Sequence, residues 1–143
     1  KRQTVEKACD LPAGSLTACL ANDYPPGEGF IPWHYDEVRA HGKLRAVASV
    51  SLGASRTFRL RPRHRLCLQD FQSSEERSAR LADATAPCIA ELELRAGDVI
   101  LMTGDCQEHL EHELPLRLTD GHRISLTFRS IVPGFEDDVS PST

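Results

Sequence analysis

The residues with the clearest chemical potential are an imidazole and a carboxylate two positions apart, His34 and Asp36. Side chains two residues apart on a β-strand project from the same face, so both groups can reach one metal ion without straining the backbone. With one further histidine they would complete the 2-His-1-carboxylate set, which holds Fe(II) and leaves positions open for a cosubstrate and O₂. The short motif therefore predicts an iron site only if the chain supplies that third ligand.

Two histidines, His109 and His112, are candidates for the third ligand. They are three residues apart, so on one strand they would point to opposite faces and only one could reach the metal. We favour His112, because it precedes Leu114-Pro115 and leads by a short polar loop into a strand that carries two arginines. We expect His109 to be exposed or to have a structural partner.

The segment from Arg123 to Arg129 alternates polar and apolar side chains, so one face would carry two arginines with hydroxyl groups between them. Such a pattern is typical of an edge strand with one solvated face. It also fits a binding strand for 2-oxoglutarate, which has a carboxylate at each end, because the arginine fork matches a carboxylate in bidentate geometry. Asn22 and Tyr24, two apart on an earlier strand, could supply further donors from across the barrel.

These residues fall on short β segments separated by turn signals such as Pro25-Pro26-Gly27 and Asp120-Gly121. We expect strands at residues 16–23, 30–35, 44–52, 56–60, 89–94, 98–102, 109–114 and 122–131. Many short strands with little helix predict a mainly β protein with a closed or sandwiched architecture, in which the inward positions form the core.

The length of 143 residues is that of one domain. We expect a lead-in segment at residues 1–15, the domain itself at 16–132 and a polar tail at 133–143. Residues 66–87 are rich in Ser, Glu, Arg and Ala and predict an insertion that carries a short helix.

Composition and charge narrow the classes of partner and compartment. Hydrophobic and charged contents of 40% and 27% are those of a soluble globular domain, and no apolar run is long enough to cross a bilayer. The net charge of −4 gives no general attraction to a polyanion, so a nucleic acid would need a local basic patch. The arginines that alternate from Arg59 to Arg65 could form one, although a solvated strand end is the simpler interpretation. Five scattered cysteines favour a reducing intracellular compartment.

Taken in order, the motifs make the chain similar to the AlkB-like family of Fe(II)/2-oxoglutarate-dependent dioxygenases. The matching stretches, from about residue 16 to residue 132, are Asn22-Asp23-Tyr24, Trp33-His34-Tyr35-Asp36-Glu37, Ser49–Gly53 with Arg56-Thr57-Phe58, Gly97–Met102, Cys106-Gln107, His112–Pro115 and Arg123–Arg129.

The resemblance implies a double-stranded β-helix, or jelly roll. It also implies that His34, Asp36 and His112 are the iron ligands at the catalytic centre. Arg123 and Arg129 would each bind one end of 2-oxoglutarate, and the assisting residues would be Asn22 and Tyr24.

The resemblance further implies an oxidation in which 2-oxoglutarate yields succinate and CO₂ while a C–H bond is hydroxylated. When that carbon is a methyl group on nitrogen, the product collapses and releases formaldehyde, so the leading expectation is demethylation of N-alkylated nucleic acid. Two alternatives stay open: the same chemistry on a protein or small molecule, and a non-catalytic module with protein partners in a larger assembly. Val38, at a position where nucleic-acid-acting members commonly have an acidic residue, favours the first alternative, as does the negative charge.

Overall fold

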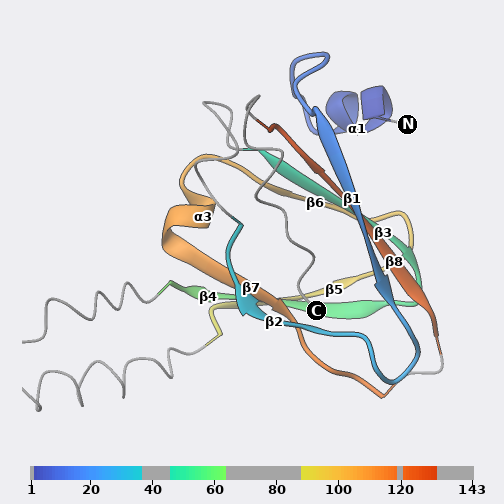
Figure 1. Ribbon diagram of the computed structural model, residues 1–143. Helices are drawn as coiled ribbons and strands as arrows, with labels where there is room; N and C mark the ends of the chain where they lie inside the picture. The colour runs from blue at the N-terminus through green and yellow to red at the C-terminus, as the bar shows by residue number, and fades with distance from the viewer. Residues whose placement is uncertain (1, 37–45, 64–87, 119–120, 132–143) are drawn as a thin grey trace, which may run out of the picture.

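Two four-stranded antiparallel sheets face each other and form the body of the domain (Figure 1). The computed structural model describes residues 2–36, 46–63, 88–118 and 121–131. The first sheet has the order β1-β8-β3-β6, with the bounds Ala18–Tyr24, Arg123–Arg129, Val47–Gly53 and Val99–Met102. The second has the order β2-β7-β4-β5, with the bounds Ile31–His34, Leu110–Leu114, Arg56–Pro62 and Ala90–Leu94.

The strand order is that of one long antiparallel hairpin that has been rolled up. Across such a hairpin the partners are β4 with β5, β3 with β6, β2 with β7 and β1 with β8, and all four pairs form. Rolling brings β8 beside β3 and β7 beside β4, and these pairs form as well. This is the topology of a jelly roll, so the expected double-stranded β-helix is confirmed.

The strands lie within a few residues of their predicted bounds. The seventh predicted strand begins one residue late, because His109 ends a short helix, α3 (Cys106–His109), and β7 begins at the extended Leu110. Helix α3 follows β6 of one sheet and leads into β7 of the other (Figure 1). The predicted helical insertion at 66–87 and the polar tail at 133–143 lie outside the described residues.

The stretch expected as a lead-in contains helix α1 (Arg2–Ala8), which packs on the outer face of the first sheet (Figure 1). Its Val5 joins a buried cluster with Leu16 and Phe128. Glu6, which is 2% exposed, accepts the backbone N–H of Leu16 at 3.0 Å, and this hydrogen bond lowers the pKa of the Glu6 carboxyl. Residues 2–16 are therefore part of the packed domain. Within the described residues, no helix has the length and apolar character that a membrane crossing requires.

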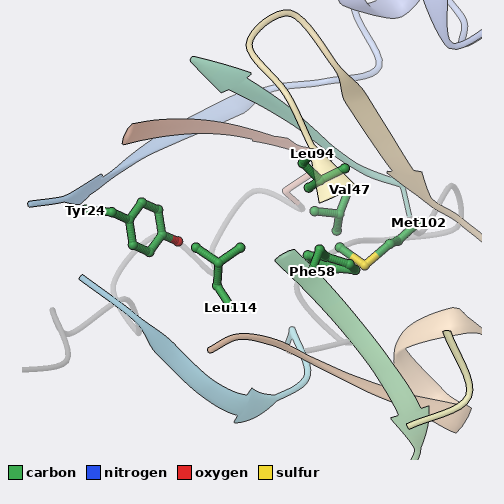
Figure 2. Packing of buried hydrophobic residues seen from close by; sticks show 6 residues of the cluster. All are labelled: Tyr24, Val47, Phe58, Leu94, Met102 and Leu114. Atoms are coloured by element: carbon green, nitrogen blue, oxygen red, sulfur yellow. The ribbon is translucent and has the colours of Figure 1, made fainter. Parts of the chain in front are cut away.

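The main hydrophobic core lies between the sheets and draws equally on both (Figure 2). Its six buried side chains are Tyr24, Val47 and Met102 from the first sheet and Phe58, Leu94 and Leu114 from the second. Leu114 comes from the same strand as His112, and Tyr24 from the same strand as Asn22. Packing of this core therefore fixes the strands that carry the candidate site.

Gly53, at the end of β3, should tolerate no side chain. Its φ is +83°, and a Cβ there would lie 2.2 Å from the carbonyl oxygen of His122, which accepts the N–H of Ala54 at 2.8 Å. Gly97 is a matched control, because its φ is +93° but a Cβ would meet nothing within 4 Å. We expect Gly97→Ala to destabilise by about 1 kcal/mol through backbone strain alone. Gly53→Ala should cost at least about 1 kcal/mol more, because of the added clash.

Denaturant unfolding of the two variants measures this difference directly. Equal losses of stability would show that the approach of β3 to His122 is looser than the structure indicates.

Candidate active site

The pairing of β2 with β7 places His34 directly opposite His112. The centroids of the two imidazole rings are 4.1 Å apart, and the ring of Phe58 stacks on His112 at 5.4 Å. The Nδ1 atom of His34 lies 2.8 Å from the carbonyl oxygen of Pro32. With the proton on Nδ1, His34 donates to that carbonyl, and its Nε2 keeps a lone pair for a ligand.

Asp36 lies two residues beyond the end of the hydrogen-bonded part of β2 and is only 6% exposed. Its Oδ1 forms an ion pair with Nη2 of Arg129 at 2.5 Å. Its backbone N–H donates to Oε1 of Gln107 at 2.9 Å, and Nε2 of Gln107 lies 3.4 Å from its Oδ2. The carboxylate is thus held by residues of α3 and β8, from two other parts of the chain.

His112 is buried, and its burial lowers the pKa of the imidazole to about 4. Electrostatic interactions with the neighbouring His34 and Arg129 act in the same direction, and the carboxylate of Asp36 opposes them. His112 is therefore a neutral imidazole at neutral pH. Only a neutral imidazole has the lone pair that binds a metal ion.

The arrangement suits a divalent metal in its donor chemistry, since two imidazoles and one carboxylate form the set that Fe(II) oxygenases use. Among the described residues, however, no three His, Cys, Asp or Glu side chains already form a closed metal-binding group. In this structure the carboxylate of Asp36 is turned to Arg129. A metal ion would thus either displace Arg129 from the carboxylate of Asp36 or bind that carboxylate together with Arg129.

The two candidates for the third histidine have different positions. His112 is on β7, buried and opposite His34. His109 ends α3 and is exposed. Only His112 is next to the first histidine, which is the arrangement expected from the sequence.

The polar face of β8 points into the space between the sheets. Arg123, Ser125 and Thr127 are buried there, while Leu126 and Phe128, on the opposite face, pack in the cluster beneath α1. β8 lies between β1 and β3, so the alternative of an edge strand with a solvated face is excluded. A row of one buried arginine, two buried hydroxyl groups and the half-buried Arg129 is a place for a polar ligand.

Asn22 and Tyr24 lie on β1, the direct neighbour of β8, and not across the barrel as expected. Asn22 is the register partner of Ser125, and Tyr24 is the partner of Arg123. The guanidinium carbon of Arg123 is 5.1 Å from the centroid of the Tyr24 ring. Burial raises the pKa of the Tyr24 hydroxyl, so this group stays protonated and able to donate.

The buried arginines of β8 have donors without acceptors among the described residues. Nε and Nη1 of Arg123 and Nε of Arg129 lack a hydrogen-bond partner, although Nη2 of Arg123 donates to Oγ of Ser51 at 3.0 Å. Leaving such charged donors unsatisfied costs free energy. A carboxylate placed against them would remove that cost, so these residues fit 2-oxoglutarate.

Two further residues of the site, Gln107 and Arg56, were missed as functional candidates. Gln107 is 2% exposed and contacts both the backbone and the carboxylate of Asp36. Arg56 is fully buried beside Tyr24. In the sequence, both residues stood out only because they lie within motifs that resemble the family. Hydrophobic periodicity carries no information on single polar contacts.

The arginine stripe of β4 is largely neutralised by neighbouring strands. Arg59 pairs with Glu91 at 2.8 Å, and Arg61 pairs with Glu111 at 2.7 Å. Arg61 also lies over Trp33 and Arg63 over Tyr35, with their guanidinium carbons 4.5 and 3.2 Å from the ring centroids. These contacts favour a structural role over a phosphate track. The last member of the stripe, residue 65, lies outside the described residues.

The family comparison agrees with this fold and this set of side chains. The model of the 2OG-Fe(II) oxygenase superfamily matches residues 1–129. The chain belongs to this superfamily. Fe(II) and 2-oxoglutarate are the cofactors of the family, as the motifs had indicated.

Curated relatives carry AlkB-type names, which confirms the AlkB-like resemblance. The DNA oxidative demethylase ALKBH2 of Arabidopsis thaliana is 29% identical over 130 residues, which cover 85% of this chain and 40% of that protein. ALKBH2 of Mus musculus is 29% identical over 129 residues, covering 90% and 48%. The alpha-ketoglutarate-dependent dioxygenase alkB homolog 3 of Homo sapiens is 28% identical over 120 residues, covering 83% and 38%. The chain spans less than half the length of these relatives.

A solved structure described as "The structure of OsALKBH1" has a similar fold. It matches with a TM-score of 0.50 and 24% identity, over 83% of this chain and 52% of that chain. This likeness supports the jelly-roll architecture.

Burial of His112 predicts that acid destabilises the metal-free chain. The folded pKa of about 4 lies below the ordinary 6.5, so as the pH falls between these values the unfolded chain takes up a proton that folded His112 does not. The stability present above pH 6.5 should therefore fall by about 3 kcal/mol at most and level off below the folded pKa. His112→Gln should remove this component.

The measurement is denaturant unfolding in chelator over this pH range, with His109→Gln as a control that removes an exposed histidine. A pH dependence that His112→Gln leaves unchanged would contradict the burial of a neutral imidazole.

Proposed function

We propose that this chain is the catalytic domain of an Fe(II)/2-oxoglutarate-dependent dioxygenase that removes alkyl groups from nitrogen atoms of nucleic-acid bases. The observation that carries the proposal is the register of β2 with β7, which sets His34 opposite His112, while the buried Asp36 follows His34 by two residues. The names of the similar ALKBH2 and alkB homolog 3 proteins support both the oxidative chemistry and, for ALKBH2, DNA as the substrate class.

In this proposal His34, Asp36 and His112 hold the iron. The two imidazoles are next to each other, and burial keeps that of His112 neutral. Gln107 fixes the backbone and the carboxylate of Asp36. With O₂ as the oxidant, bound Fe(II) and 2-oxoglutarate would supply the chemistry that hydroxylates a C–H bond, one oxygen atom entering the substrate and the other entering succinate as CO₂ is released.

Arg123 and Arg129 bind the two ends of 2-oxoglutarate, with Asn22 and Tyr24 on the neighbouring strand as further donors. The unsatisfied buried N–H groups of both arginines support this role. Arg129 also contacts Asp36, so the same cation would orient a metal ligand and one end of the cosubstrate. Binding at the two subsites should therefore be coupled.

Nucleic acid is the proposed partner because of the relatives' names. A protein or small-molecule substrate is the alternative, because the arginines of β4 are paired with glutamates and offer little charge to a phosphate backbone.

The described cysteines, Cys9, Cys19, Cys88 and Cys106, are free thiols, in line with the proposed reducing compartment.

Turnover depends on the two histidines if the proposal holds. Incubated aerobically with Fe(II) and 2-oxoglutarate, the chain should release succinate, and oligonucleotides with N-methylated bases should stimulate release and yield formaldehyde. His34→Ala and His112→Ala should each lower the rate by at least about 100-fold, because a ligand is lost. His109→Ala, a histidine outside the set, should retain it.

Succinate release that survives both ligand substitutions would refute the iron assignment. Release that no methylated oligonucleotide stimulates, with a methylated peptide active instead, would move the substrate to the alternative class.

Gln107 should tune the affinity for the metal through Asp36. Gln107→Met keeps the approximate volume but removes both contacts with Asp36. We expect Mn²⁺, a redox-stable substitute for Fe(II), to bind about 10-fold or more weakly, the effect typical of lost contacts to a metal ligand. Titration followed by electron paramagnetic resonance measures this, with His109→Gln on the same helix as control. An unchanged Mn²⁺ affinity in a folded variant would show that Asp36 needs no such support.

A further inference from the structure

Arg56, the first residue of β4, is a fully buried cation with an exposed fraction of 0%. One of its nitrogens, Nη2, donates to the carbonyl oxygens of Gly29 and Pro115 at 2.7 and 2.8 Å. Its Nε and Nη1 have no hydrogen-bond partner among the described residues. Arg56 is therefore anchored on one side and carries free charged donors on the other.

Arg56 and Arg123 approach the same tyrosine. Their guanidinium carbons lie 6.0 and 5.1 Å from the centroid of the Tyr24 ring, and Arg123 is 1% exposed. Neither forms an ion pair with a carboxylate of the described residues, and each leaves Nε and Nη1 unsatisfied. Two buried cations thus approach one aromatic ring, and neither has an ion-pair partner among the described residues, although the charge of Glu93 is near enough to favour the charged form of Arg56.

This end of β8 differs from the end that carries Arg129, whose charge is balanced by Asp36. Burying an unpaired cation is unfavourable, so two of them near one ring are stable only if something compensates their charge. A carboxylate has two oxygens and about four acceptor positions, enough to accept hydrogen bonds from both forks. The chemistry of the unsatisfied donors calls for an anion at this place.

We propose that Arg56 and Arg123 together bind one carboxylate of 2-oxoglutarate, the one remote from the metal, and that Arg56 is a specificity-determining residue for dicarboxylates. This inference rests on the proposed function. It adds a third arginine, from the other sheet, to the pair on β8. The remote end is assigned because Arg123 and Arg129 are about 20 Å apart along the strand and only Arg129 contacts a proposed metal ligand.

A purely structural role is the competing explanation, because Nη2 of Arg56 already joins the loops at Gly29 and Pro115. The two roles differ in ligand dependence. If Arg56 only held the two loops together, its loss would weaken the binding of every 2-oxo acid alike. Loss of a carboxylate-binding group would weaken only ligands that carry the second carboxylate.

The experiment compares 2-oxoglutarate with 2-oxopentanoate, which has the same 2-oxo acid end but a methyl group in place of the remote carboxylate. Calorimetric binding to the Mn²⁺-loaded full chain, without O₂, gives both affinities independently of turnover. Arg56→Met should weaken 2-oxoglutarate by about 10-fold or more and change 2-oxopentanoate by less than about 2-fold, as expected for lost charged hydrogen bonds. Arg56→Lys should lie between, because it keeps the charge and loses the fork.

Arg123→Met should show the same selective loss. Arg59→Met, which removes a partly exposed arginine of β4 that pairs with glutamates, should show none. Equal losses for both ligands, or no loss, in the Arg56 variants would overturn the inference. Should these variants fail to fold, nuclear magnetic resonance of the guanidinium Nε–H groups in the unmodified chain decides. A chemical shift of the Arg56 Nε–H group that changes on addition of 2-oxoglutarate and not of 2-oxopentanoate supports the inference. A chemical shift that neither ligand changes overturns it.

Failure of the proposed function has a different signature. An unmodified chain that binds Mn²⁺ but neither 2-oxo acid would remove the cosubstrate itself, whereas dicarboxylate binding that is indifferent to Arg56 would remove only the role of Arg56.

Discussion

The constraint on which this structure depends is the burial of positive charge between two sheets that would otherwise enclose an apolar core. Arg123, Ser125 and Thr127 occupy interior positions of β8, and the apolar residues of that strand face outward. Outward apolar side chains need a cover, and α1 provides it by packing Val5 against the cluster that contains Phe128. The helix and the polar interior are therefore two consequences of one strand orientation.

The positive charge is balanced at one end of β8 and not at the other. Asp36 compensates Arg129 and is itself fixed by Gln107, so the end that we propose for the metal is held in place by contacts within the chain. At the Arg123 end the donors remain unsatisfied among the described residues. In the proposed function, a dicarboxylate with one end at the metal and the other at these donors would balance this charge, and the proposed metal and cosubstrate residues would share a single interior.

Much of this arrangement was readable in the sequence, and the rest depended on contacts that have no local pattern. Alternation and turn residues gave the strands, and the two-residue spacing gave His34 and Asp36 a common face. Alternation in β8 could not tell which face is inside, because that depends on which strands flank it. Helix α1 has seven residues and owes its stability to packing, so propensity did not reveal it. Gln107 and Arg56 act through partners far away in the chain.

The most direct test of the central claim is a crystal structure of the chain with Mn²⁺ and 2-oxoglutarate, grown without O₂. The account predicts a metal bound by one nitrogen from each of His34 and His112 and by Asp36, with one carboxylate of the cosubstrate against the side chain of Arg129 and the other against that of Arg123. A metal bound elsewhere, or a cosubstrate that leaves the donors of Arg123 unsatisfied, would contradict it.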